Sequence, residues 1–250
     1  MGERRFAGQV AIVTGAGSGL GAAVALRIGR EGGAVACLDI AADAARTTAE
    51  AIAAAGGRAE AIAVDVSDPD SVRAAVARAA SLGRPEVLVN SAGIGGFWHS
   101  HELPFADWSR ILAVNLTGTF LMAQATLAHM IDQGGVIVNI ASNAGLMGQS
   151  YSAAYCASKG GVVNLTRALA DEYLDRKVRV LAIAPGGIAT PLQKAFRLPE
   201  GADRKKLFRI MSPLGNSEPD EIAALVCFAA SAEGRYISAS ILSIDGGLVR

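Results

Sequence analysis

Residues 10–21 read VAIVTGAGSGLG, an apolar run followed by a glycine-rich turn that leads into a helical segment at 22–30. A helix that starts in such a turn offers free backbone N–H groups and partial positive charge to a phosphate. Gly15 and Gly19 let the backbone approach a pyrophosphate closely, and Gly21 lets the helix pack on the strand. A tight turn without a ligand has the same pattern. The dinucleotide contacts expected here are Gly15, Ser18, Gly19, Leu20 and Gly21.

Apolar runs of strand length recur along the chain and alternate with helical segments. The runs are 10–13, 34–38, 61–66, 87–89, 136–140, 178–183 and 241–244, and the helical segments include 41–55, 69–80, 105–131 and 152–174. Most runs are apolar on both faces, as expected for a parallel sheet that helices cover on each side. Residues 1–250 are therefore predicted to form an α/β protein, a single doubly wound Rossmann-type domain with a parallel sheet of about seven strands.

Composition argues against several classes of function. The chain of 250 residues is 51% hydrophobic, and 23 basic side chains balance 23 acidic ones, so neither disorder nor nucleic-acid binding is expected. The three cysteines form no Cys-x-x-Cys pair, and His99 and His101 lie in a loop without further ligands, so we expect no metal site. No apolar stretch reaches the roughly 18 residues of a membrane-spanning helix. Without a visible targeting signal, a cytoplasmic protein that contacts no membrane is the expectation.

An acidic residue, Asp39, closes the second predicted strand, where a carboxylate can accept hydrogen bonds from the adenosine ribose hydroxyls of a dinucleotide. Its charge opposes the 2′-phosphate of NADP, and no Lys or Arg lies in the glycine-rich turn or directly after Asp39. Only Arg46, on the following helix, is near enough in sequence to compensate. NAD is the predicted cofactor. Asp39 can alternatively cap that helix, which is compatible with ribose binding.

Polar and small residues also end the next two predicted strands. Asp65 and Val66 close the third, and Asn90, Ala92 and Gly93 follow the fourth. The carboxyl ends of parallel strands border the ligand crevice of such a sheet, so these residues are expected at the adenine end of the dinucleotide. Each segment by itself can also be an ordinary turn.

Tyr155 and Lys159 are four residues apart in a predicted helix, so their side chains share one face. A nearby cation favours the phenolate, which lowers the pKa of a tyrosine from about 10 and makes Tyr155 a candidate general acid and base. The alternative is an exposed pair on a helix surface.

The motifs that occur together are Thr14-Gly15-x-x-x-Gly19-x-Gly21, Asn90-Ser91-Ala92-Gly93, Asn115, Ser142, Tyr155-x-x-x-Lys159, Pro185-Gly186 and Asp245-Gly246-Gly247. In this order and spacing they resemble the short-chain dehydrogenase/reductase family in its compact single-domain form. The similarity covers essentially the whole chain. Ser91 departs from the family pattern, which has a second Asn there, and this weakens a supporting contact in the turn.

The resemblance implies roles for the site residues. Tyr155 would exchange a proton with the substrate oxygen, which Ser142 would hold by a hydrogen bond. Lys159 would lower the pKa of Tyr155 and bind the nicotinamide ribose, and Asn115 would hold a water that links Lys159 to solvent. Asn115 can instead be a polar residue that bends a helix and bonds to neighbouring backbone. The nicotinamide carboxamide would be lined by Pro185, Gly186, Ile188 and Thr190.

The function that the resemblance implies is an NAD(H)-dependent hydride transfer between nicotinamide and a small-molecule secondary alcohol or ketone, by a homotetramer. Two alternatives stay open: a 3-oxoacyl-thioester reductase, and a dinucleotide-sensing protein without turnover. Residues 190–212 would cover the substrate. Their apolar side chains suit a hydrophobic substrate, while their basic ones, Arg209 among them, either attract an anionic group or lie in water.

Overall fold

The computed structural model describes residues 4–208 and 210–248. In this part of the chain seven strands form one parallel sheet, in the order β3-β2-β1-β4-β5-β6-β7. The strands are β1 (Val10–Thr14), β2 (Ala34–Asp39), β3 (Arg58–Ala63), β4 (Pro85–Asn90), β5 (Gly135–Ile140), β6 (Val178–Pro185) and β7 (Ile241–Ile244). The α-helices are α1 (Gly19–Arg30), α2 (Ala42–Ala54), α3 (Pro69–Ala79), α4 (Phe105–Leu112), α5 (Gly118–Leu127), α6 (Ala153–Tyr173), α7 (Lys205–Phe208) and α8 (Pro219–Ala230). The predicted α/β class with a parallel sheet is confirmed.

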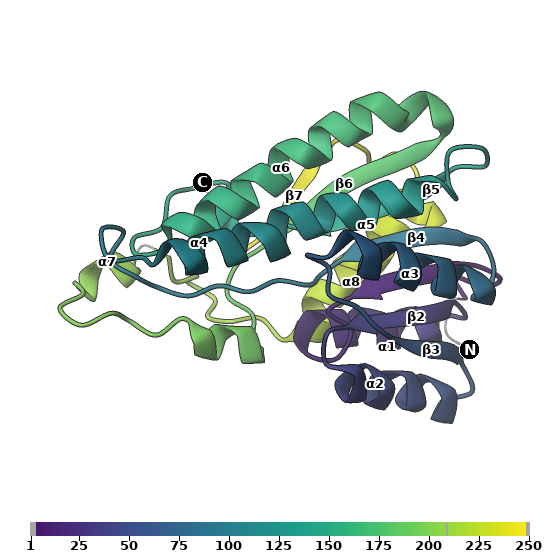
Figure 1. Cartoon of the computed structure of the whole chain (residues 1–250), viewed down its shortest axis with the longest axis horizontal. Helices are drawn as coiled ribbons and strands as arrows, with labels where there is room; N and C mark the ends of the chain where they lie inside the picture. Colours follow the sequence, from purple (N-terminus) through teal and green to yellow (C-terminus); the bar gives the residue numbers. More distant parts are fainter. Residues whose placement is uncertain (1–3, 209, 249–250) are drawn as a thin grey trace.

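Helices cover both faces of the sheet (Figure 1). Helices α1, α2 and α8 pack against one set of strand side chains, and α3, α5 and α6 pack against the other. In β1, Ala11 and Val13 belong to the first core cluster and Ile12 belongs to the second, because successive side chains of a strand point to opposite faces. Burial of apolar side chains on both faces therefore holds the three layers together.

Two predicted segments differ from the observed elements. β3 begins at Arg58 and ends at Ala63, three residues before the predicted run at each end. Within the described chain β3 pairs with β2 alone, so this edge strand carries polar side chains that an apolar pattern does not detect. The predicted helix 105–131 is α4, a π-helical turn η2 (Ala113–Thr117) and α5, which ends at Leu127.

The strand order reverses between β1 and β4, and the turns that follow these two strands meet. The Thr14 hydroxyl oxygen accepts hydrogen bonds from the backbone N–H groups of Ser91 at 3.0 Å and Ala92 at 3.1 Å. Gly15 has φ +68°, and a Cβ atom there would lie 3.0 Å from the backbone of Ala92. A crevice at the carboxyl ends of the strands opens at such a reversal, which is where parallel α/β sheets bind ligands.

The glycine-rich turn also supports the first helix, and this predicts the effect of a small substitution. A Cβ atom at Gly21 would overlap the carbonyl oxygen of Gly15, which belongs to rigid backbone. We expect Gly21→Ala to lower the free energy of unfolding by about 1–3 kcal/mol, because α1 must shift away from the turn. Thermal unfolding measures the effect. Gly148→Ala is the matched control, because a Cβ atom at Gly148 meets nothing within 4 Å. Equal stability of the two variants would contradict the close packing at Gly21.

Candidate active site

A cavity of about 870 Å³ opens at the carboxyl ends of the strands and extends from the glycine-rich turn to α6. It brings together most of the residues that the sequence singled out. Those that line it are Gly15, Ser18, Gly19, Leu20, Gly21, Asp39, Asp65, Val66, Ala92, Gly93, Ser142, Tyr155, Lys159, Pro185, Gly186, Ile188 and Thr190. Asn90 and Asn115 do not line it. The volume is within the range of roughly 300–1,000 Å³ that is usual for ligand pockets.

Asp39 holds the glycine-rich turn against the end of β2. One carboxylate oxygen accepts from the backbone N–H of Gly17 at 2.9 Å, and the other accepts from that of Ala41 at 2.9 Å. The residue that precedes the first turn of α2 is Ala41, so Asp39 bonds to the start of this helix without being its N-cap residue. A carboxylate has about four acceptor sites, so two remain for the hydroxyl groups of a ligand in the cavity.

The cation nearest in sequence to Asp39 points elsewhere. Arg46 forms an ion pair at 3.1 Å with Asp43 of the same helix, and both side chains are exposed. Arg46 does not line the cavity, whereas Arg110 of α4 does. The sequence analysis did not single out Arg110.

Two other predicted cofactor residues, Asp65 and Asn90, form hydrogen bonds within the protein. Asp65 lies after β3, beyond its end at Ala63, and accepts from the backbone N–H and the hydroxyl of Ser67, which together lower the pKa of the Asp65 carboxyl. The side chain of Asn90 is buried and donates to Asn139 of β5 at 2.9 Å. The Asn90 side chain thus joins two strands and is directed away from the cavity.

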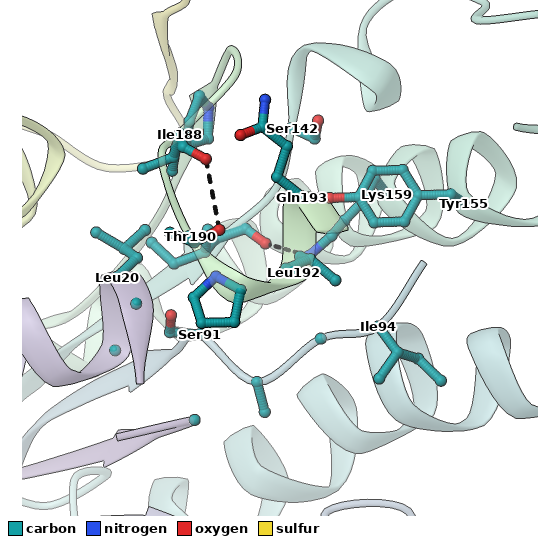
Figure 2. Close-up of a pocket in the computed structure, with 18 of the residues that line it drawn as sticks. Leu20, Ser91, Ile94, Ser142, Tyr155, Lys159, Ile188, Thr190, Leu192 and Gln193 are labelled. Atoms are coloured by element: carbon teal, nitrogen blue, oxygen red, sulfur yellow. Dashed lines mark hydrogen bonds between the residues drawn. The ribbon is translucent and has the colours of Figure 1, made fainter. Parts of the chain in front are cut away.

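Tyr155 and Lys159 both come from α6, and the ammonium of Lys159 lies 5.8 Å from the centre of the Tyr155 ring. Figure 2 shows both side chains reaching the cavity, where Thr190 and Leu192 of the segment after β6 also lie. Lys159 is only 5% exposed, and its Nζ donates to the carbonyl oxygen of Ile140 at 2.7 Å. Burial lowers the pKa of Lys159 to about 8.

Tyr155 differs from the expectation in the direction of its pKa. Burial raises the pKa of Tyr155 to about 12, and a hydrogen bond with Ser142 opposes this increase without cancelling it. The ammonium of Lys159 is bonded to Ile140, so it does not bring the Tyr155 pKa toward neutrality in this structure. The phenol is therefore protonated at neutral pH.

Asn115 lies in the π-helical turn between α4 and α5 and is fully buried. Its side-chain oxygen accepts from the backbone N–H of Ile94 at 2.8 Å, and its amide nitrogen donates to the Ile94 carbonyl at 2.9 Å and to the Ser158 hydroxyl at 3.0 Å. The side chain thus fixes the loop after β4 to α6. These bonds fit the alternative reading of Asn115 as a polar residue that bonds to neighbouring backbone. Its role in holding a water that links Lys159 to solvent stays a prediction.

Comparison with known proteins identifies the family. A family model for short chain dehydrogenases matches residues 9–201. The chain belongs to the short-chain dehydrogenase/reductase family. It is 44% identical to a D-threitol dehydrogenase of Mycolicibacterium smegmatis over 247 residues, which cover 97% of this chain and 94% of the relative.

Solved structures of this family share the whole fold. A 3-ketoacyl-(acyl-carrier-protein) reductase of Brucella melitensis complexed with NADH is 35% identical, with a TM-score of 0.88 and coverage of 97% of this chain and 98% of that chain. A structure from Beutenbergia cavernae with bound NADP at low occupancy is 35% identical, with a TM-score of 0.89 and coverage of 99% of each chain. Members of the family are oxidoreductases that use a nicotinamide dinucleotide. Of the two solved structures, one is complexed with NADH and the other has bound NADP.

Residues 190–212, which are predicted to cover the substrate, contribute to the wall of the same cavity, except that Arg209 lies outside the described residues. Their apolar members Leu192, Phe196, Ile210 and Met211 line the cavity. Their basic members Lys194, Arg197, Arg204, Lys205 and Lys206 do not. Phe97 lines the cavity as well, and its ring meets Phe196 edge to face at 5.0 Å.

Several cavity residues were missed by the sequence analysis. Ile40 follows Asp39 and is 73% exposed although it is apolar, and Asn143 and Gln149 stand between Ser142 and α6. Position directly after a predicted site residue was the available signal for Ile40 and Asn143. Gln149 carried no such signal.

Within the described residues, no three His, Cys, Asp or Glu side chains are placed to hold a metal ion. None of the described helices combines the length and the apolar character that a membrane span needs.

The buried ammonium of Lys159 predicts a pH-dependent stability difference. The pKa of Lys159 is about 8 in the folded protein and 10.5 for a lysine exposed to water, as in the unfolded chain. Burial of the charge therefore destabilises the folded state fully below pH 8 and not at all above pH 10.5. Relative to Lys159→Met, wild-type protein should therefore gain on the order of 3 kcal/mol as pH rises through this window. Denaturant unfolding at several pH values measures it. Lys194→Met is the control, because Lys194 is exposed. If the difference in free energy of unfolding between wild-type protein and Lys159→Met stayed constant with pH, the lowered pKa of Lys159 would be contradicted.

Proposed function

We propose that this protein is an NAD(H)-dependent oxidoreductase that transfers a hydride between nicotinamide and a secondary alcohol or ketone. The observation that carries the proposal is the convergence of Ser142, Tyr155 and Lys159 on one cavity whose far end is formed by Gly15 and Asp39. The residues fit an elongated dinucleotide, because the turn at Gly15 is closed by backbone without room for a Cβ atom and opens on the start of α1. The sensing alternative is disfavoured because all the catalytic residue types are present.

The residues of the chain have distinct roles in this proposal. Ser142 holds the reacting oxygen, and Tyr155 gives a proton to it during ketone reduction or takes one from it during alcohol oxidation. A bound nicotinamide dinucleotide supplies the donor or acceptor for the hydride. Because burial keeps Tyr155 protonated at neutral pH, proton donation is available there, whereas proton removal becomes more frequent as pH rises. Lys159 presents its ammonium beside the phenol, where a phenolate would form.

The other proposed cofactor contacts follow the cavity wall. The turn 15–21 and the N-terminus of α1 hold the pyrophosphate, and Asp39 holds the adenosine ribose. Asp65, Val66, Ala92 and Gly93 surround the adenine end, and Pro185, Gly186, Ile188 and Thr190 line the nicotinamide end. Asn90 is not part of this set, because its side chain is bonded to β5.

Two substrate classes remain in the proposal. The relatedness to a D-threitol dehydrogenase supports an alcohol substrate, and we favour it. The similarity to a 3-ketoacyl-(acyl-carrier-protein) reductase supports the alternative of a 3-oxoacyl thioester, and since that structure is complexed with NADH, the cofactor alone does not separate the two. Cytoplasmic location, a single domain and a homotetramer remain predictions.

The cofactor prediction concerns charge at Asp39. We expect NAD to bind at least about tenfold more tightly than NADP, because two charges about 4 Å apart repel by about 4 kcal/mol at an effective dielectric constant near 20. Asp39→Asn should narrow this gap by weakening the repulsion. Isothermal titration with both cofactors measures it. Asp175→Asn removes the same charge from an exposed site outside the cavity, so it should leave the preference unchanged. Tighter binding of NADP by wild-type protein would show that Arg110 or another cation overrides the carboxylate.

The catalytic prediction concerns the Tyr155 hydroxyl. Tyr155→Phe keeps the ring, which packs edge to face on Phe196 at 5.2 Å, and removes the acid and base, so turnover should fall at least about 100-fold while NAD binding persists. Steady-state rates and cofactor titration measure the two effects. Tyr151→Phe is the control, because the Tyr151 hydroxyl accepts from the backbone N–H of Asp203 outside the catalytic set. Retained turnover in the first variant with loss in the second would reassign the active tyrosine.

A further inference from the structure

Two amide side chains form a bonded pair in the wall of the cavity beside Ser142. The amide nitrogen of Gln149 donates to the side-chain oxygen of Asn143 at 3.0 Å, and the Ser142 hydroxyl donates to the same oxygen at 3.1 Å. The backbone N–H of Ala144 donates to the Ser142 hydroxyl at 3.1 Å, which fixes Ser142 from the other side. Asn143 is only 4% exposed, and all three side chains of this cluster line the cavity.

The pair leaves one amino group and one carbonyl oxygen without a partner. Among the described residues, the amide nitrogen of Asn143 and the side-chain oxygen of Gln149 have no hydrogen-bond partner, since the pair uses the other atom of each amide. If oxygen and nitrogen are exchanged in both amides, the pair still presents one amino group and one carbonyl oxygen. A hydroxyl group matches this combination because it both donates and accepts. A carboxylate accepts only, and a methylene group does neither.

The segment after β6 adds apolar side chains to the cavity wall, together with the amide of Gln193. The ring of Phe196 packs on Tyr155 at 5.2 Å and on Phe97 at 5.0 Å, and Leu192 also lines the cavity. A substrate between the two walls would place its C–H groups against the aromatic rings and its oxygen atoms toward Ser142 and the amide pair. A short chain that carries several hydroxyl groups meets both requirements.

We propose that Asn143 and Gln149 recognise a second hydroxyl group on the carbon next to the one that reacts, so that the preferred substrate is a vicinal diol such as a short polyol. This rests on the proposed function, which places the reacting oxygen between Ser142 and Tyr155. Asn143 directly follows Ser142 and is hydrogen-bonded to it, and two gauche vicinal hydroxyl oxygens lie about as far apart as two hydrogen-bonded atoms. The second hydroxyl therefore reaches the amide pair when the first is held by Ser142.

Oxidation of the first hydroxyl leaves the second hydroxyl unchanged. The reacting carbon gives up a hydride, which NAD accepts. The hydroxyl on the same carbon gives its proton to the Tyr155 phenolate, and the C–O bond becomes C=O. The product is a hydroxyketone. Asn143 and Gln149 exchange no proton, so their contribution is to binding and orientation, and both are specificity residues in this proposal.

Three alcohols with related carbon chains separate the possibilities. They are 2,3-butanediol, 2-butanol, which lacks the second hydroxyl, and lactate, which has a carboxylate in its place. With NAD, wild-type protein should show a kcat/KM for the diol at least about tenfold above that for 2-butanol and for lactate, as one net hydrogen bond provides. Gln149→Leu should bring the ratio of diol to 2-butanol close to one, chiefly through KM for the diol.

The control is Gln193→Leu, which removes an amide from the cavity wall without a hydrogen bond to Asn143 or Gln149. It should keep the ratio of diol to 2-butanol near the wild-type value even if both rates change. A ratio near one in wild-type protein, a ratio that Gln149→Leu leaves unchanged, or lactate as good a substrate as the diol would each overturn the proposal.

Ligand-observed NMR of the same alcohols with NADH-loaded protein separates recognition from turnover. Preferential binding of the diol that Gln149→Leu abolishes, without oxidation of any alcohol, would support the recognition by Asn143 and Gln149 and overturn the proposed function. Equal binding of the diol and 2-butanol together with robust oxidation of both would overturn the recognition and leave the proposed function in place.

Discussion

The position of the cavity depends on the hydrogen bonds that the Thr14 hydroxyl accepts. This hydroxyl lies at the end of β1 and accepts from two backbone N–H groups, of Ser91 and Ala92, which follow β4. Without this acceptor the two N–H groups would lose partners beside a buried residue, and the turn after β4 would lose its fixed distance from Gly15. Because the strand order reverses between β1 and β4, this bridge joins the two turns that border the crevice at the reversal.

Burial determines the proton chemistry at the other end of the cavity. It raises the pKa of Tyr155 and lowers that of Lys159, and both shifts have the same cause, because a low-dielectric environment disfavours either charge alone. Formation of a phenolate beside the ammonium would let each charge compensate the other. The site therefore holds a neutral phenol and an ammonium with one carbonyl partner, that of Ile140, in the position where a developing negative charge gains most.

The features that the sequence could predict are those that depend on local backbone. The turn 15–21 needs glycine at Gly15 because of its positive φ, and the spacing of Tyr155 and Lys159 is a property of one helix. The direction of the Asn90 side chain depends on Asn139 in the neighbouring strand, which no local pattern reveals. The Tyr155 pKa also depends on distant segments, since packing encloses the phenol and Ile140 engages the only nearby ammonium among the described residues.

The two walls of the cavity come from different parts of the chain, and their roles follow from this origin. The polar wall, Ser142 with Asn143 and Gln149, belongs to the connection between β5 and α6, where each side chain is fixed by hydrogen bonds. The apolar wall belongs largely to the segment after β6, which Tyr151 joins to the cavity rim by accepting from the backbone N–H groups of Trp98 and Asp203. Tyr151 has φ +67°, a strained conformation for a residue with a side chain, so the surrounding contacts must stabilise it. The polar wall is thus fixed by hydrogen bonds between side chains of one short connection, whereas the apolar wall comes from a segment that Tyr151 joins to the loop after β4.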